Sequence, residues 1–69
     1  MFSTMIEGQW RQLQGKIKEE WGNLTDDDLT RVNGQYDQMV GLLQERYGYE
    51  KAEAETRWAR FLDNVREQV

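Results

Sequence analysis

A fifteen-residue segment occurs twice in this chain of 69 residues. Residues 8–22 and 34–48 both begin and end with glycine, carry a third glycine at the centre, and place aromatic residues at the same two positions. The apolar residues of each copy recur every three or four positions, which predicts an amphipathic helix whose apolar stripe faces a core. The chain therefore predicts a single all-α domain over residues 1–69, built from two helix–turn–helix repeats at 8–33 and 34–59.

The predicted fold is a small irregular array of four helices, at about residues 5–22, 26–33, 35–47 and 51–66. No strand-like alternation of useful length interrupts them. Leu42 lies off the apolar stripe of its helix, so it is either exposed or makes a second contact. The stripes predict a core of Trp10, Leu13, Ile17, Trp21, Leu24, Leu29, Val32, Tyr36, Met39, Val40, Leu43, Tyr47, Ala54, Trp58, Phe61, Leu62 and Val65.

Several residues indicate where these helices begin and end. Thr25 is a good N-cap, and Asp28, three residues later, occupies the capping-box position. Asn33-Gly34 is a turn dipeptide that ends the second helix. Gly22 and Gly48 follow the two repeated helices, where a left-handed residue often terminates a helix.

The composition argues against catalysis. Because the chain has no Cys and no His, it can form no disulfide and it lacks the usual ligands of a zinc site. It also lacks the usual general base and the thiol nucleophile of enzymes. No carboxylate lies at a position that the apolar pattern predicts to be buried. The run Asp26-Asp27-Asp28 lacks the alternating ligands and turn glycine of a calcium loop, so it indicates a helix start. We expect no catalytic residues, no cofactor and no metal.

Charge and hydropathy limit the partners and the location. The net charge is −4, and acidic residues concentrate at 25–38. Without a basic stripe we expect neither nucleic acid nor an anionic membrane as a partner. Met1 to Glu7 shows no signal-peptide pattern and no apolar run is long enough to span a bilayer, so we expect a cytoplasmic protein.

Gly15 and Gly41 are the least ordinary feature because each falls within a helix, at a cost of about 1 kcal/mol against alanine. Both project opposite the apolar stripe. Either they simply face solvent, or they form a second face that another backbone approaches, from the other repeat or from a partner. With Asp26, Asp27 and Asp28 they make up the predicted interaction surface.

Two motifs cover most of the chain. They are Gly8-x-Trp10-Arg11-Gln12-x-x-Gly15-Lys16-x-Lys18-Glu19-x-Trp21-Gly22-x-Leu24-Thr25-Asp26-Asp27-Asp28 and Gln44-Glu45-Arg46-Tyr47-Gly48-Tyr49. Over about residues 8–55 the sequence resembles the CsbD-like family of small bacterial stress-response proteins, in particular its YjbJ-like branch. The resemblance implies an irregular helical bundle, bacterial origin, a cytoplasmic location and expression raised under general stress. It supplies no catalytic residues.

Two functional hypotheses follow for a non-enzymatic stress-response protein. In the first, the chain is a helical interaction module that docks a protein partner through its glycine face or its acidic second helix; weak self-association is compatible with this. In the second, it resembles the hydrophilins and keeps other macromolecules soluble during water loss. Small size, six glycines and low mean hydropathy favour the second hypothesis.

Overall fold

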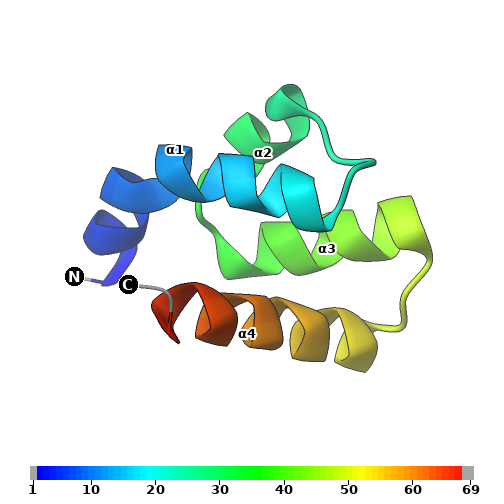
Figure 1. The fold of residues 1–69 in the computed structure, drawn as a ribbon. Coiled ribbons are helices and arrows are strands. Elements are labelled where there is room, and N and C mark those ends of the chain that lie inside the picture. The colour runs from blue at the N-terminus through cyan, green and yellow to red at the C-terminus, as the bar shows by residue number, and fades with distance from the viewer. Residues whose placement is uncertain (1, 68–69) are drawn as a thin grey trace. The chain divides into compact units, whose positions relative to one another are not determined.

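The computed structural model describes the backbone of residues 2–67 and the side chains of residues 9–66. Within that part of the chain there are four helices and no strand, which confirms the all-α prediction. The chain falls into two compact units, one ending at Met39 and one beginning at Val40, and each is described by itself. The single domain with an internal repeat stays a prediction. The helices are α1 (Phe2–Glu20), α2 (Asp26–Val32), α3 (Tyr36–Tyr47) and α4 (Lys51–Glu67) (Figure 1).

Three helices lie within one residue of their predicted bounds, and α1 differs at both ends. It begins at Phe2 rather than near residue 5, because neither proline nor glycine precedes Gly8 to stop it. It ends at Glu20 rather than 22. The Leu24 N–H donates to the Trp21 carbonyl at 3.1 Å and closes a tight turn. That turn satisfies the Trp21 carbonyl. Gly22 does not have a positive φ, so the prediction that it is left-handed is wrong.

The other two predicted chain breaks are confirmed. Asn33 has φ of 50° and Gly34 has φ of 79°, and the Gln35 N–H donates to the Val32 carbonyl at 3.0 Å. Successive positive φ values are what an Asn-Gly turn of type I′ requires. Gly48 has φ of 71° and donates to the Gln44 carbonyl at 2.9 Å, so it ends α3 as a left-handed cap.

The start of α2 is a complete capping box. The Asp28 N–H donates to Thr25 Oγ1 at 3.1 Å, and the Thr25 N–H donates to Asp28 Oδ2 at 3.2 Å. Two backbone donors that the helix itself leaves unpaired are thereby satisfied. The capping box predicted from sequence is confirmed.

Two side-chain contacts hold α2 against α1. Trp10 Nε1 donates to the Leu29 carbonyl at 2.7 Å, and Lys18 Nζ pairs with Asp26 Oδ1 at 2.6 Å. A residue at the middle of α1 thus meets the middle of α2, and a residue near the end of α1 meets the start of α2. The two helices therefore run antiparallel (Figure 1). A helix of seven residues is far too short to be stable alone, so it depends on the buried Trp10 hydrogen bond and on the burial of Leu29 and Val32.

Most of the predicted core is buried. Leu42 could have been exposed or could have made a second contact. It is only 8% exposed, so it makes a second contact. Leu13, Tyr47, Leu62 and Val65 are half-buried. The buried apolar residues in the described part of the chain are Trp10, Ile17, Trp21, Leu24, Leu29, Val32, Met39, Val40, Leu42, Leu43, Ala54, Trp58 and Phe61.

Tyr36 is the error in the predicted core, because it is 49% exposed. A helical side chain leans back over the turn that precedes its own Cα. Trp10 leans over an existing turn of α1, whereas Tyr36 is the first residue of α3 and has no helical turn behind it. The repeated sequence therefore occupies two different environments.

In the second unit, aromatic contacts hold the loop between α3 and α4. The Tyr47 and Tyr49 rings stack with centroids 5.5 Å apart, and the Arg57 guanidinium lies 4.6 Å from the centre of the Tyr49 ring. Arg57 also donates two hydrogen bonds to Glu53 Oε2, at 2.8 and 3.0 Å. Arg57 thus ties the loop to the first turns of α4.

The capping box predicts a matched pair of stability effects. Thr25→Ala removes the side-chain acceptor for the Asp28 N–H and should lower the free energy of unfolding by about 0.5–2 kcal/mol. Thr30→Ala makes the same chemical change at an exposed interior position of α2 and should leave that free energy within about 0.5 kcal/mol. Urea denaturation followed by far-UV circular dichroism measures both. Equal effects at the two positions would contradict a special role for the cap.

Candidate interaction surface

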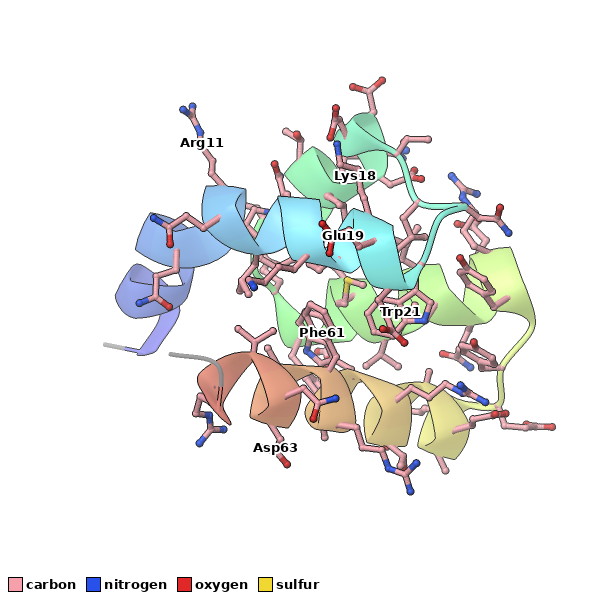
Figure 2. The ribbon with its side chains drawn as sticks, in the orientation of Figure 1. Arg11, Lys18, Glu19, Trp21, Phe61 and Asp63 are labelled. Carbon is pink, nitrogen blue, oxygen red and sulfur yellow. The ribbon has the colours of Figure 1, made fainter. Side chains whose placement is uncertain are left out.

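The aspartates of α2 do not share one environment. The Asp26 side chain is 72% exposed even though it pairs with Lys18, and Asp27 is also exposed. Figure 2 shows Lys18 on the α2 side of α1. An exposed ion pair of this kind contributes little to stability, so Asp26 and Asp27 remain accessible to a partner.

Asp28 is buried, with a side chain only 2% exposed. One carboxylate oxygen accepts from the Thr25 N–H, and the other lies 3.4 Å from Arg31 Nη2. The expectation that no carboxylate is buried is therefore wrong. The apolar pattern could not detect this burial, but the capping-box position could, since it directs the carboxylate back to the backbone. Asp28 has a structural role and is not open to a partner.

Gly15 and Gly41 are both exposed, in the interiors of α1 and α3. A methyl group at either position would meet no atom within 4 Å, and neither residue has a positive φ. Within its own compact unit, no described residue approaches either glycine closely, and the second face that another backbone approaches stays a prediction. Their helices do not require glycine for conformation or for internal packing.

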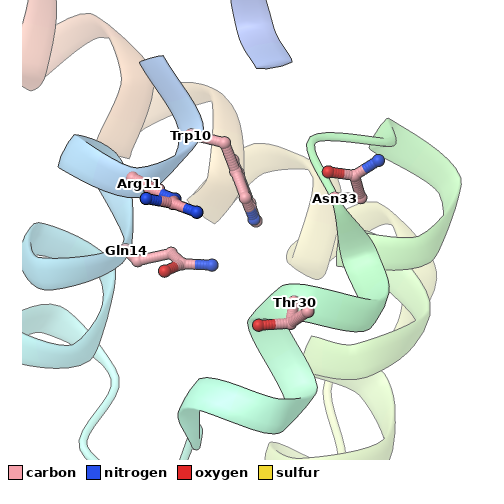
Figure 3. Close-up of a pocket in the computed structure, with 5 residues that line it drawn as sticks. All are labelled: Trp10, Arg11, Gln14, Thr30 and Asn33. Atoms are coloured by element: carbon pink, nitrogen blue, oxygen red, sulfur yellow. The ribbon is translucent and has the colours of Figure 1, made fainter. Parts of the chain in front are cut away.

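A pocket that the sequence did not reveal lies between α1 and α2. It has a volume of about 250 Å³ and is lined by Trp10, Arg11, Gln14, Thr30 and Asn33 (Figure 3). α1 contributes Trp10 together with Arg11 and Gln14, a pair three residues apart on one helical face, and the second pair is Thr30 in α2 and Asn33, the C-cap of that helix. The spacing within each pair is visible in the sequence. That the two pairs face one another depends on how α1 and α2 pack.

The lining is rich in hydrogen-bond donors. Trp10 is buried and forms a wall of the pocket, with its Nε1 already donating to the Leu29 carbonyl. Arg11 is exposed, points away from the helix in Figure 2, and forms no ion pair with any residue that the structure describes. Gln14, Thr30 and Asn33 add uncharged polar groups. None of these side chains is a general base at neutral pH.

In the described residues no group of three or more carboxylates is arranged to hold a metal ion. No helix in that same part of the chain is both long enough and apolar enough to cross a membrane.

The sequence is similar to a family of small bacterial proteins. The family described as CsbD-like matches residues 4–56. A UPF0337 protein of Protochlamydia amoebophila is 52% identical over 66 residues, which covers 96% of this chain and all of the relative. A UPF0337 protein of Pseudomonas aeruginosa is 52% identical over 65 residues, covering 94% of this chain and all of the relative. The YjbJ protein of Escherichia coli is 60% identical over 48 residues, or 70% of each chain. The names of these relatives state no activity.

The contrast between Asp27 and Asp28 predicts that only the second supports the fold. Asp28→Ala leaves the Thr25 N–H without its acceptor and should lower the free energy of unfolding by about 1–3 kcal/mol. Asp27→Ala removes the same charge from the same helical turn and should change it by less than about 0.5 kcal/mol. Chemical denaturation of both variants checks this. A large loss for Asp27→Ala would show that helix-dipole interactions outweigh the cap.

Proposed function

This chain belongs to the CsbD-like family, and from that premise we propose that it is a non-enzymatic stress-response protein that acts as a helical protein-interaction module. The partner is a protein, and the residues proposed to contact it are Gly15, Asp26 and Asp27 in the first unit and Gly41 in the second. The proposal places the chain in the cytoplasm, with neither nucleic acid nor membrane as partner. The net charge of −4 supports the exclusion of nucleic acid, because an acidic chain gains nothing from phosphate neutralisation.

One observation carries the proposal: the open space over two glycines inside helices. Each costs about 1 kcal/mol against alanine, a large share of the stability of so small a domain. The fold recovers none of this cost, since an added methyl group would meet nothing at either position. What glycine does provide is a helix surface that another backbone can approach closely. A partner that lies against these helices makes use of that property.

The second candidate function is that of a hydrophilin-like protectant, which keeps other macromolecules soluble under osmotic or desiccation stress. Mean hydropathy of −0.96 and a charged fraction of 32% favour it. A protectant acts at high molar ratio and with little specificity, so it has no single surface that one substitution destroys. The two functions therefore differ in the number of partners and in their sensitivity to point changes. Weak self-association is compatible with either.

Crosslinking from stressed and unstressed cells tests the proposal. We expect one saturable partner, captured by the parent chain and by Ala59→Arg, and lost with Gly41→Arg. Ala59 is an exposed residue of α4, so its substitution adds the same bulk and charge elsewhere. Circular dichroism checks that both variants remain helical. A broad, weak set of bound proteins, unaffected by either substitution, would exclude the module and support the protectant.

The double variant Gly15→Ala, Gly41→Ala separates stability from binding. Because each alanine favours the helix and meets no neighbour, the free energy of unfolding should rise by about 1 kcal/mol per position. Capture of the partner should weaken, since two methyl groups then project into the surface that the partner approaches. Thermal denaturation and quantitative capture measure the two effects. A more stable variant that captures the partner unchanged would mean that the glycines merely face solvent.

A further inference from the structure

We propose that the pocket between α1 and α2 binds a carboxylate group carried by the partner protein. This rests on the proposed function and names the chemistry by which the partner is recognised. The pocket lies wholly within the first compact unit, so its geometry depends only on how α1 and α2 pack. Its size, its donors, its rigidity and its neighbour Gly15 each support this assignment.

The size of the pocket limits its occupant. At about 250 Å³ it falls below the roughly 300–1,000 Å³ of pockets for drug-sized ligands and cofactors. That space suits one acidic side chain or the last residue of a chain. It does not suit a nucleotide.

The lining selects an occupant that accepts hydrogen bonds. Arg11 has five N–H donors and no acceptor, and it carries the only formal charge in the lining. The Gln14 and Asn33 amides and the Thr30 hydroxyl can each add a donor on the two sides of the pocket (Figure 3). Guanidinium and carboxylate groups match as planar, bidentate partners. A carboxylate therefore uses these donors better than a neutral group does.

The walls of the pocket are held in place before any ligand arrives. Trp10 Nε1 and the backbone N–H of Asn33 both donate to the Leu29 carbonyl, at 2.7 and 3.0 Å. One buried carbonyl thus fixes a residue from each side of the pocket. The Trp10 indole and the Asn33 backbone are thereby pre-organised, which favours affinity, whereas binding has to order the Arg11, Gln14, Thr30 and Asn33 side chains.

Gly15 connects the pocket with the proposed partner surface. It lies four residues after Arg11, so the two residues lie on the same face of α1. The open space over Gly15 lets a partner backbone approach α1 while its carboxylate reaches the Arg11 guanidinium. The pocket and the glycine face therefore act as one recognition surface on this helix.

Titration of the isotope-labelled full chain, followed by nuclear magnetic resonance at constant ionic strength, tests the proposal. The probes are N-acetylglutamate α-amide for an acidic side chain, N-acetylglycine for a chain terminus, N-acetylglutamine amide as the neutral control, and inorganic phosphate. We expect saturable shifts of the Trp10 indole N–H and of the Gln14 and Asn33 side-chain amides with one or both carboxylates. The stronger carboxylate identifies its source. Comparable shifts with the neutral probe, or tighter binding of phosphate, would overturn the proposal.

A matched pair of variants attributes the binding to the pocket. Arg11→Gln should weaken carboxylate binding about tenfold or more, as expected when a charge-assisted hydrogen bond is lost. Arg60→Gln removes the same charge from an exposed position of α4 and should leave binding unchanged. Both residues are exposed, so both variants should fold. Equal losses would show that net charge, and not the pocket, attracts the probe.

The same variants distinguish failure of this inference from failure of the proposed function. If Gly41→Arg abolishes partner capture while Arg11→Gln leaves capture intact, the carboxylate pocket is wrong and the interaction module stands. If the carboxylate probes bind but no specific partner is captured, the proposed function fails and the pocket binds a free small acid. Loss of capture with both variants supports the two together.

Discussion

The carbonyl of Leu29 is the point on which the packing of the first unit depends. It accepts the Trp10 indole N–H from α1 at 2.7 Å and the Asn33 backbone N–H at 3.0 Å. The first bond ties α2 to α1, and the second closes the end of α2. Nucleation of a helix is unfavourable, and a helix of seven residues forms few internal hydrogen bonds to offset it. It persists because a buried indole and a capping box satisfy its two ends.

That arrangement also determines which surface is left for function. With Trp10 directed at α2, the neighbouring Arg11 lies at the rim and Gln14 lies across from Thr30 and Asn33. Trp10 and Asn33 both line the pocket and donate to the Leu29 carbonyl, so the packing of α2 on α1 also fixes part of the pocket. Binding groups placed on helices are held more rigidly than groups on loops, which suits recognition by a small domain.

The glycines illustrate how stability and function are divided in this chain. Gly34 and Gly48 adopt positive φ and serve the fold directly, as turn and cap. Gly15 and Gly41 have ordinary helical conformations with open space above them, so their cost is not offset within the chain. Proteins commonly retain destabilising residues where a surface is used, and this supports looking for a partner at these positions.

Local sequence by itself determined the four helices, the capping box at Thr25, the Asn33-Gly34 turn, the Gly48 cap and most of the buried apolar stripe. These features depend on side-chain spacing and on hydrogen bonds between near neighbours, which a sequence displays directly. Tertiary structure alone decided that Tyr36 is exposed, that Leu42 is buried, and that donors from α1 and α2 meet around a pocket. Those outcomes depend on where each helix begins and on which faces pack together. Two copies of one sequence pattern cannot specify which of their residues are buried, because the surroundings of each copy differ.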